Sequence, residues 1–308
     1  MLPNPKLDWH DTGVIRILKL MAPAIFGVSV SQINLLLDTV LASFLPTGSV
    51  SWLYYSDRLS ELPLGVFAIA VATVILPSLS RNHASASAKE FNATLNWALV
   101  CVMAIALPAC LALIILAEPL ITSLFQYREF TLLDAKMASY SLMAYACGLP
   151  FFMLIKVLAP GYFARQDTIT PAKIGIVAMV SNMLLNFAFM LPLHHYFQIG
   201  HAGLALATAT SAALNASLLW VGLRRKNILH LLPTTLPLLL KIGFASLCMA
   251  ACLLFSLQWL HDLASWEWWL RVAVILGECL AGIGVYMLIL LLVGVRPRAF
   301  APNLASNH

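Results

Sequence analysis

The chain has 308 residues, of which 61% are hydrophobic and only 10% are charged. Because soluble domains carry roughly 25% charged residues, this composition excludes a disordered chain and argues strongly against a water-soluble enzyme. The formal net charge is +5 at pH 7, but the positions of the basic residues favour a membrane topology rather than binding to nucleic acid.

Apolar segments long enough to cross a bilayer follow one another along the chain with short connections. Each could span a hydrocarbon core of ~30 Å as a helix of ~20 residues. The predicted fold class is therefore an all-α polytopic membrane protein with eight transmembrane helices. A short amphipathic helix over 13–20 is expected to lie on the membrane surface before the first of them. The eight segments are 21–45, 50–79, 93–117, 132–158, 170–192, 201–223, 235–260 and 270–294.

The lysines and arginines divide unequally between the two sides of such a bundle. If the N-terminus is placed in the cytoplasm, fourteen of the 18 basic residues fall on the inner side and four on the outer side. Since inner loops are enriched in Lys and Arg, this split predicts a multi-pass protein with both termini inside. The loop around His195 is then expected on the outer side.

Polar side chains in the first two segments are the first functional candidates, because charges at membrane depth are costly. Ser31, Asn34 and Asp38 recur at helical spacing, so they share one face. The second segment has a polar stripe of Tyr54, Asp57, Arg58 and Glu61.

Two interpretations of Arg58 stay open at this point. It could face an aqueous cavity and bind an anionic substrate, since its planar fork matches phosphate oxygens, or it could form a structural ion pair. Asp38 lies at a similar depth across the hairpin and is one predicted partner. Asp57 and Glu61, on the same helix as Arg58, are the alternatives.

The later segments carry polar residues better explained by packing. Asn182 and Asn186, and then Thr208 and Ser211, have the spacing of residues that hydrogen-bond between helices. Glu278 is isolated, and contact with a neighbouring helix or with lipid headgroups is favoured over the role of a coupling carboxylate. No HExxH, GxSxG, Walker or CxxC motif occurs, which predicts no catalytic residue, metal or cofactor. Transport would then be driven by a coupling cation or the membrane potential.

Four runs of sequence resemble the MurJ/MviN family of lipid II flippases, within the multidrug/oligosaccharidyl-lipid/polysaccharide exporter superfamily. Their order and spacing also match, and the resemblance covers nearly the whole chain. The runs are Met21 to Arg81, LFQYREFT (Leu124 to Thr131), KVLAPGYFARQDTITPAK (Lys156 to Lys173) and HAGLALATATSAALNASLL (His201 to Leu219).

The resemblance implies a fourteen-helix architecture with two six-helix lobes around a cavity and a final helix pair. This chain would hold helices seven to fourteen. Residues 1–20 would be a cytoplasmic segment, 21–226 the C-terminal lobe, and 227–308 a two-helix extension with a lipid-tail groove and a short cytoplasmic tail. The N-terminal lobe, with the family's other cavity arginines, would then be required in cis or in trans.

The resemblance also implies a function. The family moves an undecaprenyl-pyrophosphate-linked muropeptide from the inner to the outer leaflet of the bacterial inner membrane by alternating access. Arg58 falls on the family's cavity arginine, with Tyr55, Asp57 and Glu61 around it as further substrate contacts. Arg165 and Asp167 fall in a cytoplasmic loop. The expected partners are lipid II and membrane lipids, with no nucleic acid.

Two rival functions remain. One is export of a polysaccharide-linked lipid or a drug by the same superfamily, and the other is a non-transporting membrane scaffold. A flippase needs a cationic cavity and a lipid groove, a drug exporter needs a cavity of acids and aromatics, and a scaffold needs neither. The stripe from Tyr54 to Glu61 favours the flippase.

Overall fold

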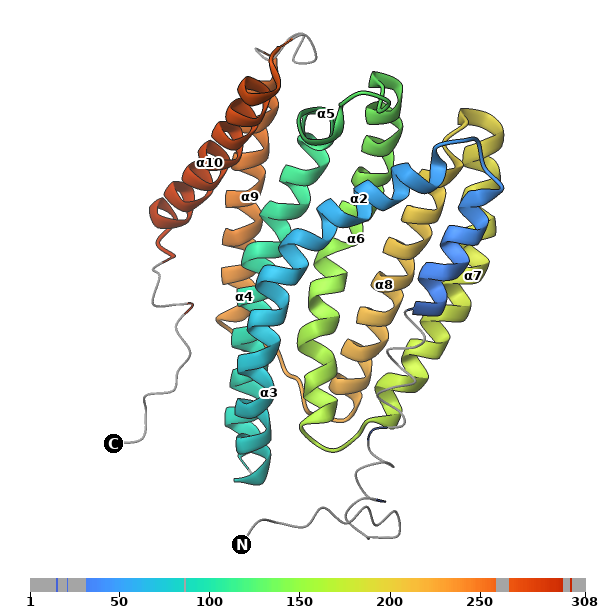
Figure 1. The fold of residues 1–308 in the computed structure, drawn as a ribbon. Helices are drawn as coiled ribbons and strands as arrows, with labels where there is room; N and C mark the ends of the chain where they lie inside the picture. The colour runs from blue at the N-terminus through green and yellow to red at the C-terminus, as the bar shows by residue number, and fades with distance from the viewer. Residues whose placement is uncertain are drawn as a thin grey trace, which may run out of the picture.

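A computed structural model describes residues 32–85, 87–258 and 266–295, together with Ile15, Met21 and Phe300. Within these residues the chain is all helical (Figure 1), and 32–43 form a helix that precedes the labelled ones. Ser31 and the predicted amphipathic helix lie outside the described residues, apart from Ile15. The helices that follow are α2 (Ser49–Pro63), the π-helical η1 (Leu64–Ala68), α3 (Ile69–Ala84), α4 (Ala88–Ile115), α5 (Ala117–Phe125), α6 (Leu132–Phe163), α7 (Ile169–Phe197), α8 (Gly200–Arg225), α9 (Thr235–Leu257) and α10 (Trp268–Leu292).

Six of the described helices, α4 and α6 to α10, are long and apolar enough to cross a membrane. They coincide with the six apolar segments expected from residue 93 onward, which confirms an all-helical membrane protein. The first two expected spans are not among the six, because the first is described only from residue 32 and the second is divided into three shorter helices. The total of eight therefore stays a prediction.

The division of the second segment has a local cause. Pro63 has no N–H to donate to the preceding turn, so the hydrogen-bond ladder of α2 cannot continue unchanged through it. The π-helical turn η1 follows directly, and such turns are a known cause of bends. In Figure 1, α2 runs obliquely across the bundle, and α3 then runs beside α4.

Helix α6 is the centre of the bundle and packs against α2, α4, α5 and α8. Its side chains Leu142, Leu149 and Met153 are fully buried. Small residues allow the closest approaches: a Cβ added to Gly148 would lie 2.8 Å from the Ala209 Cα on α8. This packing through glycine and alanine is how membrane helices gain van der Waals contact without a hydrophobic driving force.

Helices α9 and α10 form a second apolar cluster against α4. Met249 and Leu253 of α9 pack with Tyr286 of α10, whose hydroxyl donates to the Ala104 carbonyl of α4 at 2.6 Å. Glu278 accepts a hydrogen bond of 2.6 Å from Ser256 on α9, which confirms that it turns toward a neighbouring helix. The predicted domain boundary near residue 226 remains a prediction.

Basic residues gather at one end of the bundle, where α3, α6 and α8 end and α4 and α7 begin (Figure 1). This agrees with the unequal division expected from the sequence. The His195 region differs, however, because α7 continues to Phe197 and His195 belongs to its last turn. The expectation of a loop there is wrong, because the helix continues through Pro192, with apolar residues such as Leu191 before it.

Candidate functional site

The polar stripe of α2 lies on an open face of the molecule. The Arg58 Nη1 donates to the Glu61 Oε2 at 2.8 Å, and the guanidinium lies 5.1 Å from the centroid of the Tyr54 ring. The side chains of Arg58 and Glu61 remain 56% and 50% exposed. A cation is thus held along one helix while much of its surface stays accessible.

The opposite face of α2 fixes this orientation. Trp52 is buried and its Nε1 donates to the Asp134 Oδ1 of α6 at 2.8 Å. The Ser56 hydroxyl, also buried, donates to the Ala138 carbonyl of α6 at 2.7 Å. Because these bonds hold one side of α2 against α6, residues on the other side, including Arg58, face outward.

The other predicted residues of the stripe divide between these two faces. Tyr55 packs its ring 4.6 Å from that of Phe125 and 5.4 Å from that of Phe130, measured between centroids. Asp57 is half-buried and adjoins Arg58 in sequence. The structure therefore brings Glu61 and Tyr54 into contact with Arg58, and directs Tyr55 into an aromatic cluster with the α5 region.

Asp38 lies in a buried polar cluster formed by three helices. The residue is 7% exposed, and its carboxylate accepts from the Asn186 Nδ2 of α7 at 2.6 Å and the Thr208 Oγ1 of α8 at 3.0 Å. Asn182 donates to the same Thr208 hydroxyl at 3.3 Å. The expected role of these amides and hydroxyls in joining helices is confirmed, and Ser211 does the same by donating to the Ala178 carbonyl at 2.7 Å.

The predicted pair between Asp38 and Arg58 is wrong for this structure. The described residues contain two ion pairs, Arg58–Glu61 and Lys226–Asp167, and neither includes Asp38. The physical reason is reach: Glu61 is three residues from Arg58 on the same helix face, whereas neutral donors from α7 and α8 surround Asp38. Sequence spacing identified the polar groups but not their partners.

The Asp38 cluster is also where a cation could be held. The Oδ1 atoms of Asn34 and Asn186 are buried without a hydrogen-bond partner. Asn34 precedes Asp38 by four residues, one helical turn, so both face the same way. A carboxylate with amide and hydroxyl oxygens suits Na⁺ or another hard cation better than zinc, which prefers histidine and cysteine.

The two predicted loop residues, Arg165 and Asp167, both lie at the basic end of the bundle but have different neighbours. Asp167 accepts from the backbone N–H of Thr170 at 3.0 Å and its hydroxyl at 2.8 Å, and from the Lys226 Nζ at 2.7 Å. Partial burial raises the pKa of Asp167, but the hydrogen bonds from Lys226 and Thr170 and the lysine charge outweigh it, so this pKa lies below its ordinary value. Arg165 instead lines a pocket described below.

Sequence reasoning missed a buried histidine near the α2 anchor. His201 of α8 is 1% exposed, its Nδ1 lies 2.8 Å from the Ser141 hydroxyl, and its ring centroid lies 4.8 Å from that of Trp52. Its position in the run His201 to Leu219 was noted, but nothing in the spacing indicated burial.

Comparison with known proteins identifies the family of this chain. The sequence model of the family described as "Lipid II flippase MurJ" matches residues 1–274. The chain belongs to this family. It is 49% identical over 296 residues to a probable lipid II flippase MurJ of Vibrio cholerae, covering 96% of this chain and 55% of the relative. The lipid II flippase MurJ of Burkholderia cenocepacia is 41% identical over 80% of this chain and 47% of its own length.

Solved structures agree with this membership. A lipid II flippase MurJ in an inward closed conformation superposes with a TM-score of 0.71 and 31% identity, over 92% of this chain and 55% of that one. A MATE transporter in complex with MaD3S has a TM-score of 0.58 at 15% identity, over 90% of this chain and 63% of its own, which shows a shared fold alone. The chain spans about half the length of its MurJ relatives.

The family membership determines the broad class. The relatives are named as flippases of lipid II, which makes them lipid transporters rather than enzymes. The six apolar helices agree with a multi-pass membrane protein.

Proposed function

We propose that this chain acts in flipping lipid II, the undecaprenyl-pyrophosphate-linked muropeptide, from the inner to the outer leaflet by alternating access. The observation that carries the proposal is the exposed Arg58–Glu61 pair on the open face of α2. Charged side chains within membrane-spanning segments are costly and therefore mark functional sites, and Arg58 keeps much of its guanidinium accessible to a ligand. The membership in the MurJ family supports lipid II as that ligand.

In this proposal Arg58 binds the pyrophosphate. Glu61 is bonded to Nη1, and a guanidinium has five N–H donors, so further donors remain for phosphate oxygens. An arriving diphosphate can form two parallel hydrogen bonds and displace the single carboxylate contact. The guanidinium stays stacked over the ring of Tyr54. Asp57, the residue before Arg58, is the second nearby carboxylate. Tyr55 would support α2 through its aromatic contacts.

The architecture of the proposal follows the family. The chain would supply helices seven to fourteen, with residues 32–43 and the bent helix of α2, η1 and α3 as the two further spans. The rest of the cavity would come from the other half of the relatives' length, in cis or in trans. Exposed apolar side chains of α9 and α10, such as Phe244 and Leu280, would face the isoprenoid tail.

We also propose that a cation bound at Asp38 couples to transport. A buried carboxylate is costly without a positive partner, and the neutral donors of Asn186 and Thr208 compensate only part of its charge. The unpartnered oxygens of Asn34 and Asn186 fit a cation entering this cluster. Such a site would link the helix at 32–43 to α7 and α8, and so couple ion binding to their movement.

The transport proposal is tested by complementation. A full-length MurJ-family protein carrying this segment is expressed in cells depleted of their own flippase. Arg58→Ala should abolish growth while the protein remains in the membrane, and Arg58→Lys should restore growth only in part, because a point charge lacks the bidentate fork. Arg225→Ala is the control for loss of one exposed charge. Normal growth with Arg58→Ala would reject a role in substrate binding.

The proposed orientation has both termini inside, with the end carrying Arg224 and Arg225 in the cytoplasm. A cysteine at position 196 should react with a membrane-impermeant thiol reagent in intact cells, and a cysteine at position 225 should not. The opposite labelling pattern would invert the topology.

A further inference from the structure

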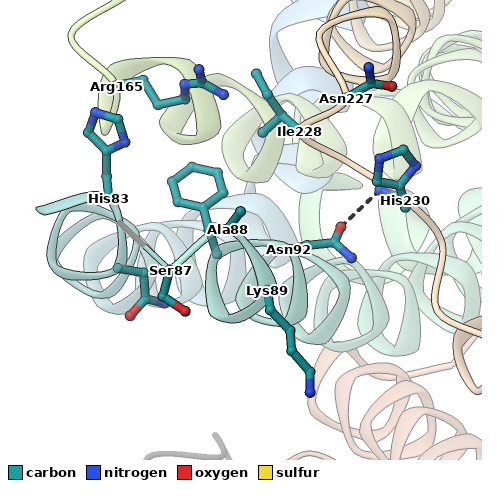
Figure 2. Close-up of a pocket in the computed structure, with 11 residues that line it drawn as sticks. His83, Ser87, Ala88, Lys89, Asn92, Arg165, Asn227, Ile228 and His230 are labelled. Atoms are coloured by element: carbon teal, nitrogen blue, oxygen red, sulfur yellow. Dashed lines mark hydrogen bonds between the residues drawn. The ribbon is translucent and has the colours of Figure 1, made fainter. Parts of the chain in front are cut away.

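A pocket of about 530 Å³ lies at the basic end of the bundle (Figure 2). Three connections form it: the turn between α3 and α4, the loop after α6 and the loop after α8. These segments are far apart in sequence, so the pocket exists only because the bundle brings its helix ends together. The pocket is separate from the α2 stripe, because it lies at the opposite end of α6 from Asp134, which anchors α2.

The lining is basic and contains no acid. Among its described residues are Arg165, Lys89, His83 and His230, together with neutral hydrogen-bonding side chains such as Asn227. Figure 2 shows His83 and Arg165 together on one side and His230 on the other, while Lys89 extends away from both. A concave site with positive charge, neutral donors and no carboxylate favours an anion.

The Arg165 guanidinium is available to a ligand. Of the two ion pairs in the described part of the chain, neither contains Arg165 or Lys89. The nearest acid along the chain, Asp167, is already bonded to Lys226 and Thr170. That pairing removes the carboxylate that would otherwise compete for Arg165.

One wall of the pocket is held in place by two asparagine amides of α4. The backbone N–H of His230 donates to the Asn92 Oδ1 at 2.9 Å, and the Asn96 Nδ2 donates to the backbone carbonyl of His230 at 2.8 Å. Asn96 is 2% exposed and its Oδ1 accepts from the N–H of Leu232 at 3.1 Å. These bonds hold the loop after α8 against α4, so this wall of the pocket is fixed by contacts within the protein.

The position of the pocket along the membrane-spanning helices indicates which class of anion it binds. It lies at the ends of α4, α6 and α8, three helices long and apolar enough to span the bilayer. Helix ends of this kind reach the layer of lipid headgroups, and basic pockets between membrane helices recognise phosphate headgroups there. The first turn of α4, whose N-cap is Ser87, also carries Glu90, which lies outside the pocket lining.

We propose that this pocket binds a phosphate group, contacted chiefly by Arg165 and His83, with Lys89 at the rim. The group comes either from an anionic phospholipid or from a soluble phosphate compound. This site is additional to the proposed flippase site and does not depend on it.

The test uses the whole chain in nanodiscs of phosphatidylcholine with a small fraction of phosphatidylglycerol. Retained phosphatidylglycerol is counted by native mass spectrometry, and a parallel arm titrates inorganic phosphate in pure phosphatidylcholine and follows thermal unfolding. Arg165→Ala should lower retention by about tenfold, since charge-assisted bonds to phosphate are strong, and His83→Ala should lower it less. Arg225→Ala, which removes one positive charge at the same end outside the pocket lining, should leave retention unchanged.

The outcomes separate the sources. Retention that falls with Arg165→Ala supports a lipid headgroup, whereas a phosphate-dependent stabilisation lost in Arg165→Ala supports a soluble phosphate. If neither response depends on Arg165, or if Arg225→Ala reduces both equally, the proposal is overturned. Equal binding by all variants is also the result expected if an acidic protein segment fills the pocket. Arg165→Gln, which preserves side-chain length and polarity, guards against misfolding and should behave like Arg165→Ala.

Discussion

Asp38 and Arg58 are charged residues on neighbouring helices, and the fold treats them in opposite ways. Asp38 is 7% exposed and is surrounded by neutral donors from α7 and α8. Arg58 is more than half exposed and pairs with Glu61 on its own helix. Asp38 is therefore part of the helix packing, whereas Arg58 stays accessible on a surface.

The difference shows that the cost of a charge near the membrane can be lowered by two routes. Hydrogen bonds from buried neutral groups hold Asp38 but tie three helices together, so changes there should disturb the fold. A local pair and an aromatic neighbour hold Arg58 without joining helices, so changes there should disturb binding more than stability. The predictions below separate these two outcomes.

The largest stability effect is expected for Asp38→Ala. The buried donors of Asn186 and Thr208 lose their acceptor, and the void adds to the loss, so the free energy of unfolding should fall by about 2–3 kcal/mol. Thermal and denaturant unfolding in detergent measure this. Glu61→Ala, which removes an exposed carboxylate instead, is the matched control. Equal losses in both variants would contradict the contrast between the two regions.

A second prediction concerns the space available for a side chain at two glycines, Gly203 in α8 and Gly65 in η1. A Cβ at Gly203 would lie 2.8 Å from the backbone carbonyl oxygen of Phe189, so Gly203→Ala must push α8 away from α7. We expect a loss of about 1–2 kcal/mol by the same measurement. Gly65, in η1 after α2, has nothing within 4 Å of its added Cβ. Gly65→Ala should leave stability unchanged or raise it by less than about 1 kcal/mol.

Glu61→Gln should have a small effect on stability and a larger one on binding. Because both members of the pair are half exposed, its loss should cost less than about 1 kcal/mol of folding free energy. The freed Arg58 should bind a soluble diphosphate a few-fold more tightly, as isothermal titration can measure. Asp38→Asn should leave that affinity unchanged, since Asp38 does not pair with Arg58 in this structure. Tighter binding by Asp38→Asn would instead support pairing of Asp38 with Arg58.

The smallest effect is expected from pH at the basic end. The pKa of Asp167 is lowered in the folded protein, so its contribution to stability is present in full above its unfolded pKa of about 4 and is lost as pH falls through the lower folded value. Lys226 is partly exposed, so the contribution is about 0.5 kcal/mol or less. The stability difference between the wild type and Asp167→Asn should shrink below pH ~4, whereas replacement of the exposed Glu129 by Gln should produce no such change.

The sequence predicted the helices well where apolar length was the signal. The expected segments 132–158, 170–192 and 201–223 correspond to α6, α7 and α8, which extend a few residues further. It missed the short helix α5, because α5 follows α4 directly and the apolar sequence shows no change where one helix ends and the next begins. It also missed the π-helical η1, although Pro63 marked the position where the ladder had to change.

The candidate site was predicted as a set of residues and not as a set of contacts. Helical spacing placed Arg58 and Glu61 on one face, and this is a local property that the chain determines by itself. The partners of Asp38 lie 148 and 170 residues away, and spacing along the chain carries no information about such distances. The same limitation concealed the pocket lined by His83, Arg165 and His230.

The amino-acid sequence by itself determined the class of protein, the positions of most helices, the polar stripe of α2 and the concentration of positive charge at one end. These follow from composition and from the 3.6-residue period, which act within one helix. Only the tertiary structure decided which charges are buried and which stay open, because burial depends on the helices that pack against each face. Asp38 faces α7 and α8 and became part of the packing, whereas Arg58 faces away from α6 and remained accessible.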